Sequence, residues 1–189
     1  MTWIAAVTPE QASAELAPIY ARIAAQSRSG RVSNLWCAWG GDASGLATLH
    51  AHYRALMGEP APLTVAQVEM IALAVSATNG CGYCVSHHGV RLSRLVGDEL
   101  AHAVALDYRE ANLAARDRVL LDAAVALTCE PAERTRADIE RVREYGFDDA
   151  TILKATEVAA LYNLVNRVVS ALGVPLENGL ERWEYGAQR

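Results

Sequence analysis

The chain has 189 residues, 52% of them hydrophobic and 21% charged, and a net charge of −5. This length suits one domain with a substantial core, and the acidic balance without a long Lys/Arg run argues against a nucleic-acid surface. No stretch reaches the roughly 18 apolar residues that a bilayer span requires, and the first residues lack the basic and apolar regions of a signal peptide. We therefore expect a cytoplasmic protein that binds neither nucleic acid nor membrane.

The first half of the chain shows helical periodicity. Pro9-Glu10 after Thr8 predicts a helix start, because apolar residues follow at helical spacing as far as Ile23. Residues 27–34 are polar and predict a loop. A second helix is expected over residues 44–57, where the apolar positions again fall on one side, and the segment Gly58-Glu59-Pro60-Ala61-Pro62 ends it.

The middle of the chain predicts two consecutive helices joined by a tight turn. Thr64-Val65-Ala66-Gln67 fits a capping box. The helix that it opens, about residues 65–78, is apolar on nearly all sides and should therefore be central and buried. Asn79-Gly80 predicts the turn, and the next helix begins at or near Cys81 and runs to about residue 96.

Capping residues, breakers and helical periodicity predict four further helices, whereas the last residues show no such pattern. Their expected ranges are 98–106, 112–128, 134–145 and 148–172. The tail 177–189 has no clear periodicity. Because no alternating β pattern occurs, and because Ala and Leu are abundant while Phe occurs once, the chain predicts an all-α fold.

A Cys-x-x-Cys motif at Cys81 and Cys84 is the strongest chemical signal. In a reducing compartment such a pair is catalytic or metal-binding more often than structural. Its place at a helix N-terminus lowers the pKa of a thiol, because the helix dipole stabilises the thiolate. Offsets of three, four and seven residues put Cys81, Cys84 and His88 on one helix face. His88 can therefore accept the thiol proton of Cys84.

Glu69 lies inside the apolar central helix and needs a partner. An unpaired carboxylate there would be strongly unfavourable or protonated. We expect His88 to be that partner, across the two-helix corner; an Arg from elsewhere is the structural alternative. A Glu–His–Cys relay would move a proton from the attacking thiol to the leaving oxygen. The attacking thiol would become a sulfenic acid that the second thiol condenses into a disulfide.

These residues resemble a known family. The pattern Glu69, eleven residues, Cys81-x-x-Cys84-x-x-x-His88 resembles that of the AhpD-like alkylhydroperoxidases, within the carboxymuconolactone decarboxylase superfamily. Residues 67–89 carry most of the match. The later stretch Tyr162-Asn163-Leu164-Val165-Asn166-Arg167, followed by Leu172-Gly173-Val174, is similar to the peroxidase-related branch.

The resemblance implies an AhpD-like helical bundle, with the Cys-x-x-Cys at the N-terminus of a central helix. It implies one domain over residues 1–189, with a core of about 44–175 and an N-terminal helical extension, 8–26. It further implies a homo-oligomer, trimer or hexamer, that reduces organic hydroperoxides without a cofactor or metal and is regenerated by an external dithiol reductant or carrier protein. By position, Cys84 matches the peroxidatic thiol, Cys81 the resolving thiol, and Glu69 with His88 the proton relay.

Tyr83 departs from the best-studied members, which carry a second His just before the second Cys. A tyrosine, with a pKa of about 10, is a poor relay near neutral pH. His87 points roughly 100° away from His88 on a helix, which predicts an exposed position, although it is also a candidate pocket residue. The polar residues of the last helix line a pocket or an oligomer contact: Asn163, Asn166 and Arg167.

Several alternatives stay open at this point. Cys81, Cys84, His88 and Glu69 could on paper bind zinc, or the two thiols could be inert. Helix position alone favours Cys81 as the attacking thiol, whereas proximity to His88 favours Cys84. The functional alternatives are a carboxymuconolactone decarboxylase-type lyase and a non-enzymatic redox-sensing or metal-binding oligomer.

The remaining cysteines and aromatic residues predict packing rather than chemistry. Cys37 and Cys129 have no Cys neighbour in sequence and are expected to be small buried hydrophobes. Trp36 and Trp39 predict core or interface anchors. The isolated histidines are expected on the surface or in packing: His50, His52 and His102.

Overall fold

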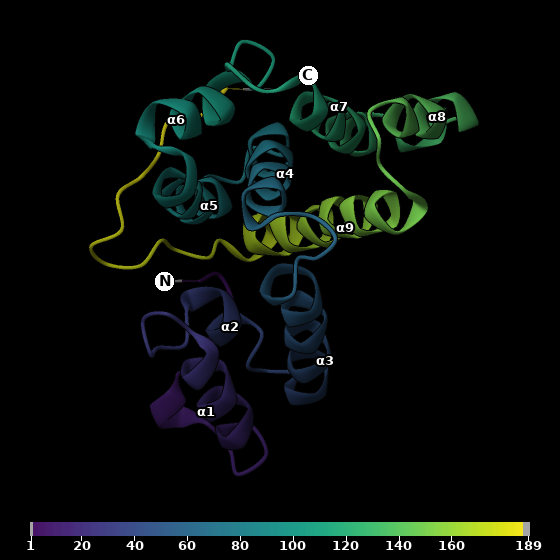
Figure 1. Cartoon of the computed structure of the whole chain (residues 1–189). Coiled ribbons are helices and arrows are strands. Elements are labelled where there is room, and N and C mark those ends of the chain that lie inside the picture. Colours follow the sequence, from purple (N-terminus) through teal and green to yellow (C-terminus); the bar gives the residue numbers. More distant parts are fainter. Residues whose placement is uncertain (1, 187–189) are drawn as a thin grey trace.

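The computed structural model describes residues 2–186, and every regular element in that range is a helix (Figure 1). The predicted all-α fold is therefore confirmed; residues 1 and 187–189 of the predicted domain lie outside the described range. The α-helices are α1 (Ala17–Gln26), α2 (Asn34–Ala38), α3 (Ala43–Tyr53), α4 (Val65–Thr78), α5 (Gly82–Val96), α6 (Asp98–Asp107), α7 (Ala115–Cys129), α8 (Arg136–Glu144) and α9 (Asp149–Leu172).

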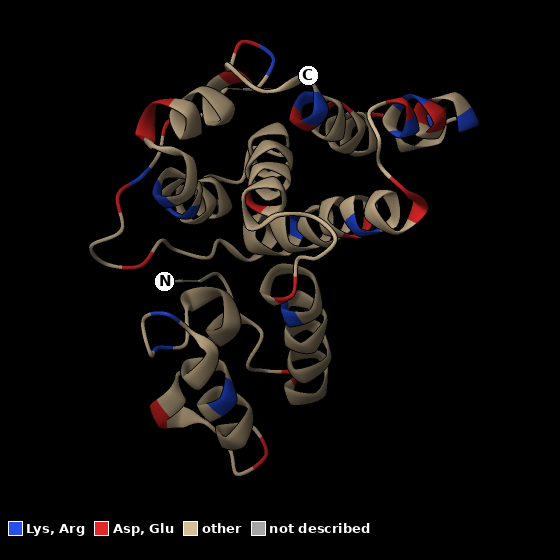
Figure 2. Ribbon diagram, viewed as in Figure 1, with Lys and Arg blue, Asp and Glu red and all other residues tan. Residues whose placement is uncertain are grey.

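Helix α4 occupies the centre, and α5, α6, α7 and α9 surround it (Figure 1). Every residue from Val68 to Thr78 is buried, as an all-round apolar helix requires. The predicted capping box is present, since the Gln67 N–H donates to Thr64 Oγ1 at 3.1 Å and the Thr64 N–H donates to Gln67 Oε1 at 2.9 Å. Figure 2 shows charged residues gathered on outer elements such as α8, whereas α4 is almost uncharged.

The N-terminal segment differs from the expected continuous helix. Residues Pro9–Gln11 form only a 3-10 turn, and α1 begins separately at Ala17. Pro18 explains the break, because proline lacks an N–H and is tolerated in the first turn of a helix but not in its interior. The short helix α2 follows the predicted loop and was not expected.

A small second core joins this segment to α3. Its buried residues come from α1, α2, α3 and the residue before α1: Leu16, Ile19, Tyr20, Ile23, Trp36 and Leu46. Trp36 packs in this core as expected, since its ring meets His50 and Tyr53 edge-on at centroid distances of 5.2 and 5.5 Å. It also lines a cavity beside α5, which was not expected. Cys37 is buried as expected, but Cys129 is exposed, because it is the last residue of α7, where the helix leaves the core.

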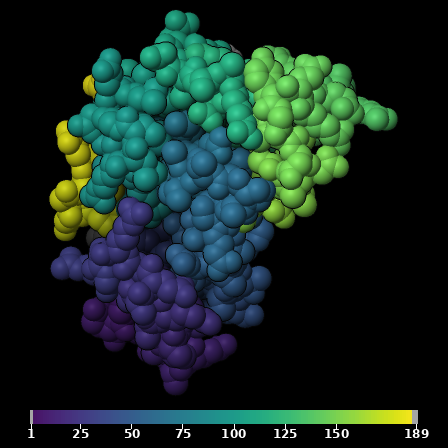
Figure 3. Space-filling view, viewed as in Figure 1, coloured from purple at the N-terminus to yellow at the C-terminus, as the bar shows by residue number. Residues whose placement is uncertain are grey.

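The chain after α9 is ordered by packing rather than by secondary structure. Gly173 ends α9 in the left-handed conformation, with φ 59°. The following segment runs along the outer side of the part formed by α5 and α6 (Figures 1 and 3). Trp183 is buried there: its backbone N–H donates to Ser86 Oγ at 3.0 Å, and its ring stacks on that of His102 with a centroid distance of 3.9 Å. The tail, which carried no sequence signal, thus covers one side of α5.

None of the helices in residues 2–186 is long and apolar enough to cross a bilayer.

Candidate active site

The two thiols lie at the corner between α4 and α5. Gly80, with φ 70°, allows the tight turn that the sequence predicted. The Cys81 N–H donates to the Ser76 carbonyl at 2.9 Å, and the Cys81 carbonyl accepts the first bond of α5 from Val85 at 3.0 Å. Cys81 is therefore the N-cap of α5 and Cys84 lies in its first turn; both side chains are buried, and no disulfide joins them.

The pKa values of the two thiols are shifted in opposite directions. The Cys84 thiol donates a hydrogen bond to Cys81 and, against the effect of burial, lowers the pKa of Cys81 to about 7, assisted by the Cys84 N–H and by Ser170 and Asn166. The same contact, together with burial, holds the pKa of Cys84 well above its usual range. Cys84, however, is the thiol that lines a cavity. The hydrogen bond from Cys84 thus favours the thiolate on Cys81, whereas access to the cavity favours Cys84 as the attacking thiol.

Glu69 and His88 form a buried pair, as the sequence predicted. Glu69 Oε2 lies 2.6 Å from His88 Nδ1. Burial raises the pKa of Glu69, but His88 and Arg91 outweigh it, so the carboxyl is ionised more readily than usual. Burial lowers the pKa of His88 more than Glu69 raises it. The consistent state is a Glu69 carboxylate that accepts Nδ1–H from a neutral imidazole, which leaves Nε2 as the proton-accepting nitrogen.

Arg91 is a second partner of Glu69. Its Nη1 lies 3.9 Å from Glu69 Oε1 and donates to the Tyr53 hydroxyl at 3.0 Å. Both expected explanations of the buried carboxylate therefore hold together. The sequence interpretation missed Arg91, although a signal existed: it lies three residues after His88 and seven after Cys84, on the same face of α5.

A small cavity of about 60 Å³ opens beside Cys84 and His88. Since roughly 10–15 Å³ is enough to hold one water molecule, the cavity has room for a few waters or for a small ligand. Its walls come from the segment around α2, the end of α3, α5 and α9: Ser33, Leu35, Trp36, Tyr53, Tyr83, Cys84, His87, His88, Arg91, Tyr162 and Val165. The N-terminal segment that the sequence placed outside the core therefore supplies part of the cavity wall.

The predicted pocket residues divide into two groups. Tyr83 and His87 line the cavity, and His87 is half-buried rather than exposed. The polar residues of α9 instead join a network behind the thiols, because Asn79 Nδ2 donates to Asn163 Oδ1 at 3.1 Å and to Asn166 Oδ1 at 3.0 Å. Asn166 Nδ2 donates to Ser76 Oγ at 3.0 Å, and Arg167 Nη1 donates to Asn163 Oδ1 at 2.7 Å. Asn166 also contacts both thiols.

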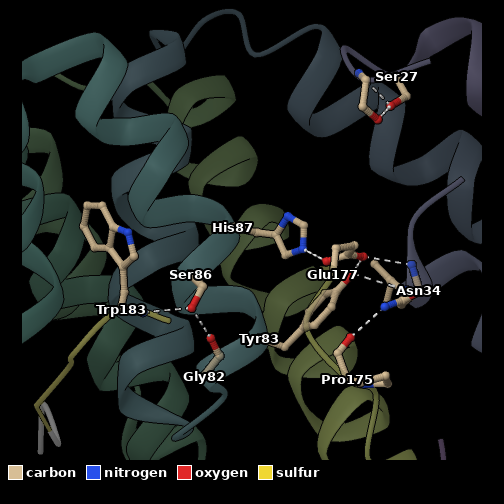
Figure 4. Close-up of polar contacts among 11 residues, drawn as sticks. Ser27, Asn34, Gly82, Tyr83, Ser86, His87, Pro175, Glu177 and Trp183 are labelled. Atoms are coloured by element: carbon tan, nitrogen blue, oxygen red, sulfur yellow. Dashed lines mark hydrogen bonds and ion pairs between the residues drawn. The ribbon is translucent and has the colours of Figure 1, made fainter. Parts of the chain in front are cut away.

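Glu177 of the tail holds Tyr83 and His87 in place (Figure 4). The Tyr83 hydroxyl donates to Glu177 Oε1 at 2.7 Å, and His87 Nε2 lies 2.6 Å from Glu177 Oε2. The Asn34 N–H donates to the same carboxylate at 2.9 Å, which links α2 to the tail. Burial and the Glu177 charge raise the pKa of Tyr83, so Tyr83 anchors structure rather than relays protons. A lone Glu in an aperiodic tail gave no signal of this role.

Replacing Glu177 with Gln is expected to destabilise the protein at neutral pH, with a difference that shrinks in acid. Burial opposes ionisation, but His87, Tyr83 and the Asn34 N–H lower the pKa of Glu177 from 4.5 to about 2. A carboxyl whose pKa is lower in the folded protein stabilises it above the unfolded value, and this stability is lost as pH falls from 4.5 towards about 2. Chemical unfolding of both proteins from neutral pH down to about pH 3 measures it.

Glu181→Gln, an exposed carboxylate four residues further on, is the matched control and should change little at any pH. A pH-independent difference between the Glu177→Gln variant and the unmutated protein would show that the carboxylate charge is not what holds the tail.

Within the described residues, no group of three or more His, Cys, Asp and Glu side chains is arranged to hold a metal ion.

Comparison with solved structures shows the same fold in several proteins. An uncharacterized peroxidase-related protein from Ralstonia eutropha JMP134, described as an alkylhydroperoxidase AhpD core, is 27% identical over 95% of this chain and 94% of its own, with a TM-score of 0.85. An uncharacterized peroxidase-related protein from Silicibacter sp. TM1040 is 35% identical over 86% of this chain and 85% of its own, with a TM-score of 0.80.

A debrominase also has this fold. The debrominase Bmp8, solved in complex with 2,3,4-tribromopyrrole, is 18% identical over 94% of this chain and 95% of its own, with a TM-score of 0.76. At that identity the likeness concerns the fold alone. No curated protein matches the chain.

The sequence match agrees with the structural one. Residues 45–97, which include Glu69, both thiols and His88, match the family described as the Carboxymuconolactone decarboxylase family. Together with the 35% identity to the Silicibacter protein, this match shows that the chain belongs to the carboxymuconolactone decarboxylase family and has the AhpD-like fold.

Proposed function

We propose that the protein is a thiol-dependent peroxidase that reduces organic hydroperoxides. The observation that carries the proposal is the position of Cys84, which lines the cavity next to His88 while Cys81 lies one helical turn away. The lyase alternative uses acid–base groups without a thiol pair, so it leaves the two buried, contacting thiols without a role.

In the first step, His88 Nε2 accepts the Cys84 thiol proton while Glu69 stabilises the resulting imidazolium. The Cys84 sulfur attacks the terminal oxygen of the hydroperoxide. A sulfur–oxygen bond forms, the oxygen–oxygen bond breaks, and sulfur is oxidised as the peroxide is reduced. The leaving alkoxide takes the proton from His88 and departs as the alcohol, which leaves a Cys84 sulfenic acid with its hydroxyl.

In the second step, the Cys81 thiolate attacks the sulfenic sulfur. The sulfur–sulfur bond forms and the sulfur–oxygen bond of the sulfenic acid breaks. The leaving hydroxide takes from the solvent the proton that Cys81 gave up on ionising, and becomes water. Before oxidation, the hydrogen bond from Cys84 is the main cause that lowers the pKa of Cys81 to about 7. Its place at the N-terminus of α5 continues to favour the Cys81 thiolate after Cys84 is oxidised, which suits this resolving role.

Regeneration then needs an external dithiol. We propose a dithiol compound or carrier protein that transfers two electrons and two protons to the disulfide by thiol–disulfide exchange and becomes oxidised itself. We also propose that the chain works as a homo-oligomer, a trimer or hexamer, as the family resemblance implies.

The test is a panel of hydroperoxides incubated with the unmutated protein and either dithiothreitol or dihydrolipoamide, with the cysteine state followed by mass. We expect one Cys81–Cys84 disulfide for each peroxide consumed, and continuous turnover when a dithiol is present. A disulfide that forms without dithiol-driven turnover would favour a redox sensor, and unchanged thiols with every peroxide would refute the proposal.

A further inference from the structure

Tyr162 has an unusual hydroxyl. Among the described residues, it is the one buried side-chain nitrogen or oxygen without a hydrogen-bond partner. The residue is 2% exposed, lies on α9 and lines the cavity beside Cys84. Burying a hydroxyl without a partner is unfavourable, so the protein retains a polar atom there that its own contacts do not explain.

Tyr162 lies beside the residues that are proposed to react, His88 and Cys84. The Tyr162 ring meets His88 edge-on at a centroid distance of 4.5 Å. Burial raises the pKa of Tyr162, and Tyr53, Glu69, Arg91 and Cys84 are close enough for their charges to affect it. The hydroxyl therefore stays protonated and can act as a donor throughout the neutral pH range.

Arg91 supplies positive charge to the same cavity. Of its guanidinium nitrogens, Nη1 donates to Tyr53 and lies 3.9 Å from Glu69. The remaining N–H groups have no hydrogen-bond partner among the described residues, and the side chain keeps 34% of its surface exposed. A guanidinium always carries charge and presents several donors in one plane.

We propose that the Tyr162 hydroxyl and the Arg91 guanidinium form a subsite for the leaving oxygen of a small alkyl hydroperoxide. This inference rests on the proposed peroxidase function. When Cys84 attacks the terminal oxygen, negative charge develops on the oxygen that remains with the alkyl group. The Tyr162 hydroxyl donates a hydrogen bond to that oxygen and Arg91 stabilises its charge, while the proton itself arrives from His88.

The size of the cavity restricts the alkyl group. The cavity holds about 60 Å³ and is lined by aromatic, aliphatic and polar side chains, so a hydroperoxide with a small alkyl group is expected to fit it best. The subsite therefore takes a small hydroperoxide whose leaving oxygen needs stabilisation.

The test compares two oxidants of similar size with very different leaving groups. Ethyl hydroperoxide releases the strongly basic ethoxide, whereas peracetic acid releases the weakly basic acetate, which needs little help. Tyr162→Phe should slow the oxidation of Cys84 by ethyl hydroperoxide about 10²-fold, as for other lost oxyanion donors, and slow the reaction with peracetic acid far less. Single-turnover rates are measured by quenching and mass, with no reductant present.

Two further measurements separate this role from a structural one. Because the Tyr162 hydroxyl has no partner in the described structure, Tyr162→Phe should leave the unfolding temperature unchanged or higher. Tyr108→Phe, which removes a buried hydroxyl bonded to Asp122 at 3.0 Å away from the cavity, should lower the unfolding temperature and leave both oxidation rates unchanged.

An equal loss of rate with both oxidants, or no loss with either, would overturn the subsite and leave the proposed function intact. A protein whose thiols resist ethyl hydroperoxide before any mutation would instead refute the peroxidase function itself.

Discussion

Replacing Cys84 with serine is expected to abolish hydroperoxide turnover. Cys84 is the thiol that lines the cavity, and a serine hydroxyl cannot form a sulfenic acid or a disulfide. The steady-state rate should fall by about 10³-fold or more, to the level without protein. The measurement is the consumption of hydroperoxide with dithiothreitol in excess, with the fold checked by circular dichroism.

Cys81→Ser should behave differently, and this difference assigns the two roles. Without the resolving thiol, Cys84 should still form a sulfenic acid once, which a sulfenic-acid-specific reagent traps. Cys129→Ser, which changes an exposed thiol far along the chain, should keep full turnover. If a sulfenic acid is instead trapped on Cys81 in the Cys84→Ser variant, Cys81 is the attacking thiol and our assignment of the two roles is reversed.

Replacing Glu69 with Gln should produce the second-largest loss. The amide keeps the shape of the carboxyl group but not the charge that stabilises an imidazolium on His88, so Cys84 oxidation should slow by about 10²-fold or more. Because Glu69 raises the pKa of His88 against the larger effect of burial, its removal should lower that pKa further. The acid limb of the rate profile should then move to lower pH.

Stopped-flow rates of Cys84 oxidation across a pH series measure both effects. Glu184→Gln, at an exposed position of the tail, is the control and should leave both the rate and the profile unchanged. A slower enzyme whose acid limb stays in place would mean that Glu69 holds the corner together through Arg91 and His88 without taking part in proton transfer.

The sequence predicted the parts of the molecule that depend on local chemistry. Thr64 and Gln67 identified the start of α4, and its unbroken apolar pattern identified it as the central helix. Offsets of three, four and seven residues placed Cys81, Cys84 and His88 together, because a helix fixes which residues share a face. The partner of Glu69 followed from the cost of burying an unpaired charge, and the 2.6 Å contact with His88 confirms it.

The sequence did not predict contacts between segments that lie far apart in the chain. Glu177 lies about ninety residues from Tyr83 and His87, and no periodicity connects a single acid in an aperiodic tail to a helix. Trp36 reached the cavity wall through α2, a helix too short to show a period. Pro18 divided the N-terminal segment because of backbone sterics that apolar spacing does not reveal.

By itself, the sequence determined the helical class, the central helix and the thiol–imidazole–carboxylate set, since propensity, capping and helical spacing are local properties. Only the tertiary structure decided which thiol lines the cavity, how Tyr83 and His87 are held, and that Arg91 and Tyr162 line the same small cavity. The reason is physical: burial, access and pairing arise when α2, α5, α9 and the tail pack together, and no local pattern encodes that packing.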